Sequence, residues 1–275
     1  MMSQAQPGQD SPELVIDVIV MHDANDAWVR VRDSFAIAGL PVSTRFDAID
    51  GTCLTAHELR SCVTPRAEYE LSVGRRFPFG WVHEGLPSIG AVGCYLSHLE
   101  LWKRAAQRSV PTLILEQDAE PVVSPETILK ALADIPAETD VAFLGHLALF
   151  KPKLWEKLST QAAAGFHPVL PTSDVFCTHA YLVTPDGARK LVERAMPINA
   201  QVDAFMRFLC TPHSGLRMVF HSPSLIDQRA EEASSIQTRG TTLDYLLQGS
   251  MMASRAAFNG IMATMGRAWQ WVRRR

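Results

Sequence analysis

The chain has 275 residues, of which 47% are hydrophobic and 20% are charged, and its formal net charge at pH 7 is −3. This length is enough for one large domain with a sizeable core. The near-neutral charge lacks the basic excess that nucleic-acid-binding proteins usually carry, so we expect no nucleic-acid partner. Five cysteines are dispersed without a Cys-x-x-Cys pair, which is typical of reduced thiols in a cytosolic protein and not of a disulfide framework or zinc site.

Short apolar runs alternate with stretches of helical spacing along the chain. In chain order they predict a strand at 14–20, a helix at 24–38, a strand at 43–49, a long loop at 74–90, a helix at 90–107, a strand at 112–115, a helix at 125–132, strands at 141–144 and 180–184, and a helix starting at Pro185. Strands alternating with helices favour an α/β domain with a mostly parallel, Rossmann-like central sheet flanked by helices.

The two ends of the chain differ from this pattern. Residues 1–13 are polar, without the basic start and apolar stretch of a signal peptide, and we expect them to be disordered. No apolar run approaches the roughly 20 residues that span a bilayer. Residues 241–275 predict an amphipathic basic helix carrying Trp269 and ending in three arginines. Such a helix either lies on an anionic membrane surface or packs against the domain or a second subunit as a homodimer contact. We therefore expect a cytoplasmic protein, at the inner face of the membrane if the tail binds lipid.

Three acidic side chains stand where one predicted strand ends. Residues 113–121 read LILEQDAEP, with Glu116, Asp118 and Glu120 at alternate positions. In an open α/β sheet the ligand crevice lies outside the carboxyl ends of the strands. The acids therefore belong either to a solvated loop or helix cap, or to a divalent cation site, since hard cations prefer carboxylate oxygens.

Motifs of several other enzyme classes are missing from the sequence. It has no G-x-x-x-x-G-K-[ST] loop and no G-x-G-x-x-G after a strand, which argues against kinases, ATPases and dehydrogenases. It also has no G-x-S-x-G elbow of an α/β hydrolase and no H-E-x-x-H, and no two histidines have metal-binding helical spacing.

Four segments in order carry a family resemblance. They are FDAIDG at 46–51, GAVGCYLSHLELW at 90–102, LILEQDAEP at 113–121, and THAYLVTPDGARKLV at 178–192 followed by PINAQVDAF at 197–205. Their order and spacing over about residues 14–237 resemble glycosyltransferase family 25, the lipo-oligosaccharide and collagen galactosyltransferase-like proteins. The resemblance implies an A-type glycosyltransferase fold over 14–240, with a nucleotide-sugar half at about 14–123 and an acceptor half at about 124–240.

The resemblance also implies an activity. Family members invert the anomeric centre and use sugar nucleotides, commonly UDP-galactose, so we expect transfer of a hexose from a UDP-sugar to an oligosaccharide or glycolipid acceptor of lipopolysaccharide or a related surface glycan. A Mn²⁺ or Mg²⁺ ion held by carboxylates neutralises the leaving diphosphate. Asp118 fills the last acidic position of the family motif and is the implied ligand, with Glu120 as an additional one. Glu116 is expected to orient the ribose or the metal's water, with Gln117 beside it in the donor site.

A second carboxylate is expected to take the proton from the acceptor hydroxyl. Asp203, in the family-like Gln201-Val202-Asp203, is the first candidate, and Asp174 and Asp227 are lesser ones. The alternative for Asp203 is a first-turn residue of a helix, where the macrodipole favours negative charge.

Five further residues are expected at the donor site. Phe46, Ala48 and Asp50 are implied by their motif to line the base and ribose pocket, although Asp50-Gly51 is also an ordinary turn pair. Ser97 and His98 either reach the donor phosphates or bond one another and the core.

Three departures from the family pattern keep a second function open. Gln117 stands where the family usually has Asp, Ala91 replaces a Glu, and residues 18–27 lack the "N-L-D-R-x-x-D-R" character. These changes favour the alternative of a catalytically degenerate member that binds a nucleotide or glycan or acts as a scaffold.

Overall fold

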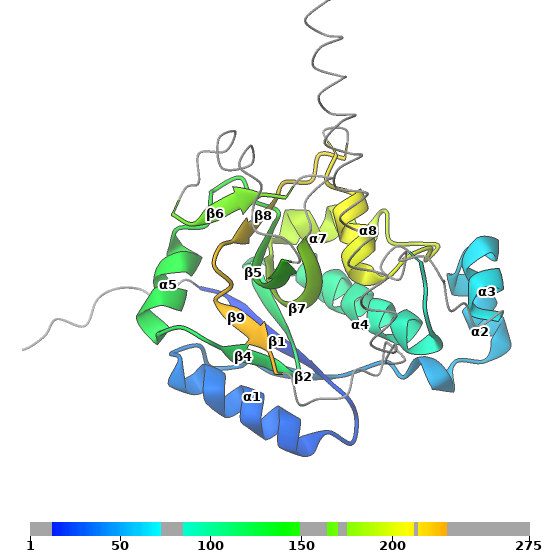
Figure 1. Ribbon diagram of the computed structural model, residues 1–275, viewed down its shortest axis with the longest axis horizontal. Helices are drawn as coiled ribbons and strands as arrows, with labels where there is room; N and C mark the ends of the chain where they lie inside the picture. The colour runs from blue at the N-terminus through cyan, green and yellow to red at the C-terminus, as the bar shows by residue number, and fades with distance from the viewer. Residues whose placement is uncertain (1–12, 73–84, 149–163, 170–174, 212–213, 230–275) are drawn as a thin grey trace, which may run out of the picture.

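The computed structural model describes residues 13–72, 85–148, 164–169, 175–211 and 214–229. Within them, seven strands form a central sheet in the order β2-β1-β3-β7-β5-β8-β6, and β4 and β9 form a second, two-stranded sheet (Figure 1). The strands are β1 (Val15–Val20), β2 (Thr44–Asp47), β3 (Thr112–Glu116), β4 (Ala119–Pro121), β5 (Val141–Ala148), β6 (Phe166–Pro168), β7 (Val175–Val183), β8 (Met218–His221) and β9 (Ile226–Gln228). The helices are α1 (Asn25–Ile37), α2 (Ala56–Cys62), α3 (Pro65–Ser72), α4 (Ile89–Ala105), α5 (Pro125–Ala133), α7 (Pro185–Val192) and α8 (Val202–Phe208), with a 3₁₀ turn η1 (Gly51–Cys53).

The central sheet is mixed but mostly runs one way. Strands β1, β2 and β3 are mutually parallel, and β5 is parallel to β8. Strand β7 lies between β3 and β5 and is antiparallel to both, so β5 and β8 share the direction of β1, β2 and β3. Only β7 and the edge strand β6 run the other way among the described strands. This confirms the predicted α/β fold with a mostly parallel central sheet.

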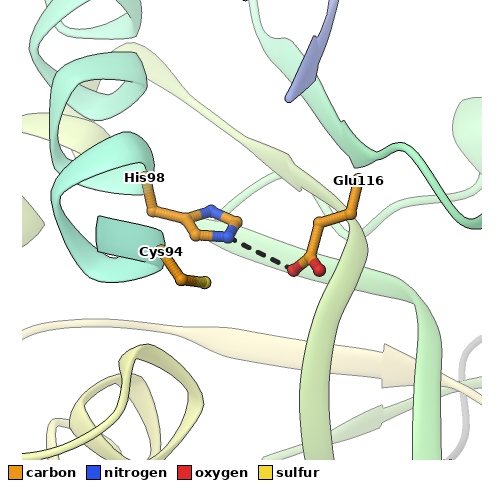
Figure 2. A group of neighbouring side chains, drawn as sticks. All are labelled: Cys94, His98 and Glu116. Carbon is orange, nitrogen blue, oxygen red and sulfur yellow. Dashed lines mark hydrogen bonds and ion pairs between the residues drawn. The ribbon is translucent and has the colours of Figure 1, made fainter. Parts of the chain in front are cut away.

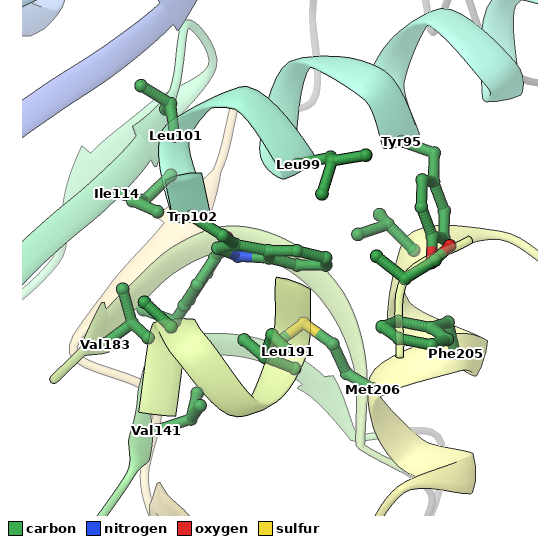
Figure 3. Close-up of a cluster of buried hydrophobic side chains, with 14 of the residues drawn as sticks. Tyr95, Leu99, Leu101, Trp102, Ile114, Val141, Val183, Leu191, Phe205 and Met206 are labelled. Atoms are coloured by element: carbon green, nitrogen blue, oxygen red, sulfur yellow. The ribbon is translucent and has the colours of Figure 1, made fainter. Parts of the chain in front are cut away.

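Apolar cores cover both faces of the sheet. Strand β3 is buried on both sides, with Ile114 facing one core and Leu113 and Leu115 the other, as expected for a continuous apolar strand. Helices α4, α7 and α8 pack over the first face, where Trp102 and Phe205 stack with centroids 5.9 Å apart (Figure 3). Helices α1 and α5 belong to the opposite core.

Local sequence signals set the bounds of the helices that frame the site. The Ser88 side chain caps α4 by accepting from the Ala91 N–H, and Thr184 caps α7 by accepting from the Gly187 N–H, in the manner preferred at helix N-termini. Pro185 occupies the first turn of α7, where its missing N–H costs nothing.

The strands predicted at 14–20, 43–49, 112–115, 141–144 and 180–184 are confirmed as β1, β2, β3, β5 and β7, and the four predicted helices as α1, α4, α5 and α7. Residues 1–12 and the predicted tail helix at 241–275 lie outside the described residues, as does most of the loop predicted at 74–90. In the part of the chain that the structure describes, no helix has the length and apolarity to cross a membrane.

Candidate active site

Several of the residues singled out in the sequence lie at one end of the central sheet, where its parallel strands finish. Strands β1, β2 and β3 end there, and β7 begins there because it runs antiparallel to β3. The turn at Gln117 and Asp118 leads from β3 into the small β4–β9 sheet. The carboxyl ends of parallel strands are where α/β folds bind ligands, so this end of the sheet is the candidate active site.

Glu116 is the last residue of β3, and its side chain is held by Thr178 and His98. Its Oε1 accepts a hydrogen bond from Thr178 Oγ1 at 2.8 Å and lies 3.3 Å from His98 Nε2 (Figure 2). Burial on its own raises the pKa of Glu116, but hydrogen bonding to His98 and Thr178 outweighs burial and leaves the pKa below its usual value. Glu116 is therefore held as a carboxylate.

Asp118 has an open oxygen and an unfavourable charge. Its Oδ2 accepts from Gln228 Nε2 at 3.1 Å, whereas its buried Oδ1 has no hydrogen-bond partner among the described residues. Burial first, and then the negative charge of Glu116, raise the pKa of Asp118 to about 7. A carboxylate oxygen that is buried, unpaired and next to a second negative charge fits a divalent cation, which would satisfy the oxygen and offset both charges.

Glu120 does not share this geometry. Its Oε1 receives Arg229 Nη2 at 2.7 Å across the two-stranded sheet, and Asp227 is its register partner on β9. The ion pair neutralises Glu120 and leaves it no need of a cation. This observation disfavours the expected role of Glu120 as an additional ligand, and we keep Asp118 alone as the ligand.

Gln117 joins the ends of two neighbouring strands. Its side-chain carbonyl Oε1 accepts from the Met21 N–H, just after β1, at 2.8 Å. The side-chain oxygen of Gln117, which replaces the family's middle Asp, is therefore hydrogen-bonded to the backbone of the turn that follows β1.

Cys94 lies among the site's acids. Cys94 and His98 are one turn apart on α4, and Cys94 Sγ, His98 Nε2 and a Glu116 oxygen lie within 4.8 Å of one another (Figure 2). Burial, followed by the charges of Glu116, Asp203 and Asp118, raises the pKa of the Cys94 thiol well above its usual value. The negative charges that act on this thiol come from the carboxyl end of β3 and from α8, which are far apart in sequence. Cys94 was not predicted from the sequence, although a Cys–His pair four residues apart on a helix is a signal that identifies it.

Asp203 sits in the first turn of α8 and faces β7. Its Oδ2 accepts from the Cys177 N–H at 3.2 Å and its Oδ1 from the Ala204 N–H at 2.7 Å. Cys177 has φ +72°, a left-handed conformation that costs a non-glycine residue roughly 1–2 kcal/mol. Asp203 lines a small cavity with Cys177 and Arg207. Asp174 lies outside the described residues, and Asp227 is exposed on β9.

The segment after β2 has mostly structural contacts. Phe46 is buried, with the Arg104 guanidinium 4.8 Å from its ring centroid. The Ala48 N–H bonds the Val20 carbonyl oxygen at 2.8 Å, which fixes the turn beside the end of β1. Asp50 caps η1: its hydrogen bonds from the Thr52 hydroxyl and N–H lower its pKa.

Two family-like motifs interlock through glycines. A methyl group on Gly93 of α4 would lie 2.5 Å from Gly51 N and closer still to the Ile49 carbonyl oxygen. Ser97 is fully buried next to this contact, where its Oγ accepts from the Ile49 N–H and donates to the Gly93 carbonyl, both at 2.8 Å. The Ser97 hydroxyl is therefore engaged in supporting the turn that begins at Ile49, which favours the structural alternative for this residue.

A cavity of about 700 Å³ lies elsewhere, at the end of the sheet where β5 begins. It is lined by residues that include Asp140, Lys190 and Arg217. Lys190 Nζ contacts both Asp140 carboxylate oxygens at 2.8 Å, so these two charges in the cavity wall are already paired. This cavity lies at the opposite end of the central sheet from Glu116 and Asp118.

The antiparallel strand β7 is inserted into the mostly parallel sheet beside the acid-bearing end of β3, an arrangement compatible with the predicted A-type glycosyltransferase fold. The chain belongs to glycosyltransferase family 25: the family model described as "Glycosyltransferase family 25 (LPS biosynthesis protein)" matches residues 43–206. No curated protein sequence matches the chain. Among solved structures, mouse xyloside xylosyltransferase 1 in its apo form aligns with a TM-score of 0.39 and 8% identity, covering 76% of this chain and 85% of that one. The chain is thus a glycosyltransferase by family.

Proposed function

We propose that the protein is an inverting, metal-assisted glycosyltransferase that moves a hexose, galactose in the first instance, from a UDP-sugar to a saccharide acceptor of lipopolysaccharide or a related surface glycan. The observation that carries the proposal is the placement of Glu116 and Asp118 at the carboxyl end of β3, where the buried Asp118 Oδ1 has no hydrogen-bond partner among the described residues. Family membership supports the reaction class, and this arrangement supports the assignment of roles.

The donor side is assigned to β3 and the segment after β2. Asp118, through Oδ1, would hold Mn²⁺ or Mg²⁺, and the chemistry that such an ion supplies is neutralisation of the charge on the departing diphosphate. Glu116 would accept the ribose hydroxyls through Oε2, the oxygen that receives no hydrogen bond from the described residues. Ala48 and Asp50, above the buried Phe46, would border the base and ribose pocket.

The acceptor side is assigned to Asp203. In a single displacement the acceptor oxygen forms a bond to the anomeric carbon while the bond to the diphosphate breaks, and the hydroxyl proton passes to a base. Backbone N–H groups hold both Asp203 oxygens in place, and each oxygen keeps a second lone pair for that proton.

Turnover by site variants tests these roles. UDP-galactose hydrolysis and transfer would be measured on the full chain with Mn²⁺, with Mg²⁺ and with EDTA. We expect Asp118→Ala and Asp203→Asn each to lose on the order of 10²–10⁴-fold in turnover, and the control Asp33→Asn, at an exposed position of α1, to stay within about twofold. Undiminished turnover in Asp118→Ala would remove that residue from the mechanism.

A second candidate function is a catalytically silent member that binds a nucleotide or glycan. It is favoured by the engagement of two motif positions, Gln117 with the Met21 N–H and Glu120 with Arg229. Calorimetric titration with UDP and Mn²⁺ decides between the two functions: metal-dependent UDP binding together with turnover rejects the silent protein, and binding without turnover supports it.

The tail at 241–275 is proposed to contact either the inner face of the cytoplasmic membrane, where a glycolipid acceptor would lie, or a second subunit. Liposome co-sedimentation of the full chain and of a truncation after Gly249 separates the two. Equal sedimentation of both proteins would exclude the membrane contact.

A further inference from the structure

A buried hydrogen-bond chain reaches Glu116 from the core. Trp102 Nε1 donates to Tyr181 Oη at 2.8 Å, and Tyr181 Oη lies 2.9 Å from His98 Nδ1. His98 Nε2 lies 3.3 Å from Glu116 Oε1. Trp102, Tyr181 and His98 are all fully buried, so water does not satisfy any of these groups.

The chain fixes the tautomer of His98. The indole N–H of Trp102 can only donate, so Tyr181 Oη is its acceptor. The single Tyr181 hydroxyl proton then has one acceptor within reach in the described structure, His98 Nδ1. If Nδ1 carried the imidazole proton instead, the buried tyrosine proton would have no partner, which is costly in a protein interior. Nδ1 is therefore the acceptor, and Nε2 carries the proton.

This tautomer determines which Glu116 oxygen is open. His98 Nε2 and the Thr178 hydroxyl both contact Oε1 and also lie 3.4 Å from one another. Oε2 receives no hydrogen bond from the described residues. In this tautomer His98 Nε2 directs its proton at Glu116 and offers no lone pair to a metal ion.

We propose that His98 is a positioning residue: fixed as the Nε2–H tautomer by Tyr181 and Trp102, it orients Glu116 so that Oε2 binds the ribose hydroxyl pair of the nucleotide donor. The inference rests on the proposed function for the identity of the ligand. The hydrogen-bond chain itself does not depend on that function.

The tautomer is tested without any ligand. Long-range ¹H–¹⁵N correlation spectra of the full chain labelled at histidine should show His98 with a protonated Nε2 and an unprotonated Nδ1. Tyr181→Phe removes the hydroxyl that donates to Nδ1 and should shift the Nδ1 resonance to that of a nitrogen without a hydrogen-bond donor, while Nε2 stays protonated because the Glu116 carboxylate can only accept. Trp102→Phe, the matched control, removes only the donor to Tyr181 and should leave Nε2 protonated. A protonated Nδ1 in the unaltered protein overturns the proposal.

The consequence for binding is tested with two nucleotides. Calorimetry would compare UDP with 2′,3′-dideoxy-UDP, both with Mn²⁺. Because a hydrogen bond to a charged group is stronger than a neutral one, we expect the unaltered protein to prefer UDP by about tenfold. Glu116→Ala should abolish the preference.

Two replacements of His98 separate positioning from packing. The Gln amide can donate from a position near that of Nε2, so His98→Gln should retain most of the preference for UDP. The shorter Asn amide cannot reach Glu116, so His98→Asn should reduce the preference to about twofold or less. A purely structural role of His98 would weaken binding of both nucleotides equally and leave the ratio unchanged, which would overturn the proposal.

Failure of the proposed function can be distinguished from failure of the positioning role of His98. If the unaltered protein binds no UDP, the nucleotide assignment fails and the ribose contact fails with it, whereas the spectra still decide the tautomer. If UDP binds with no preference over the dideoxy nucleotide, the proposed function stands and the positioning role is overturned. Should a His98 variant not fold, Thr178→Val, which removes the other donor to Oε1, tests the same orientation through the same ratio.

Discussion

Replacing Gly93 by Ala sets two opposite effects against each other at the contact between α4 and the segment after β2. In a helix interior, alanine is favoured over glycine by about 1 kcal/mol. Against this, the new methyl group would lie 2.5 Å from Gly51 N, about 1 Å inside an ordinary contact. Both obstructing atoms, Gly51 N and the Ile49 carbonyl oxygen, belong to the backbone and have no rotamer by which to move away.

The clash should outweigh the gain in helix propensity. Overpacking in a well-packed interior costs roughly 1–3 kcal/mol, and we take the upper end because the Ile49 N–H is also fixed by Ser97. The net expectation is destabilisation by about 2 kcal/mol, or roughly 4–8 °C in Tm for a domain of this size. Displacement of the Ala48–Asp50 turn should also lower donor affinity.

Urea unfolding followed by circular dichroism measures this difference. Lys103→Ala on the exposed side of the same helix is the control and should change stability by no more than about 0.5 kcal/mol. A Gly93→Ala protein as stable as the unaltered one, or more stable, would show that propensity dominates and that the two motifs do not pack against each other as described.

Three further outcomes are expected. Burial and a neighbouring carboxylate raise the pKa of Asp118 to about 7; its charge therefore destabilises the folded state fully above pH 7, and this penalty fades as pH falls towards the unfolded value near 4. Asp118→Asn should accordingly raise the urea midpoint at pH 8 more than at pH 5 while abolishing stabilisation by Mn²⁺, and a pH-independent gain would contradict the assignment. Asp17 is fully buried and receives Arg108 Nη1 at 2.7 Å, so Arg108→Met should cost about 3–5 kcal/mol by leaving a buried charge unpaired; the double variant with Asp17→Val should recover most of the loss in the same unfolding assay. Ser97→Ala leaves the Ile49 N–H without its acceptor and should cost about 1–3 kcal/mol, whereas an unchanged midpoint would mean that this N–H finds water.

Much of the site could be anticipated from the sequence because its acids lie where apolar runs end. Because β3 was predicted to end near Leu115, Glu116 and Asp118 were expected at the carboxyl end of the sheet. The helix signal around Asp203 matches the first turn of α8. The pairing of Glu120 with Arg229 was not predictable, since the two residues are 109 positions apart and meet only because β4 pairs with β9. Short strands of three residues such as β4 and β9 carry too little periodicity to be recognised.

The sequence by itself determined the longer strands and helices, since apolar periodicity and capping residues act within a few positions of the chain. Only the tertiary structure decided the partners of the site's polar groups. The antiparallel insertion of β7 between β3 and β5 brings Thr178 to Glu116, and β9 brings Gln228 to Asp118 from 110 residues away. Strand order and direction depend on how whole elements pack. The type of each side chain is therefore fixed by the sequence, whereas its neighbours, and hence its chemistry, are set by the fold.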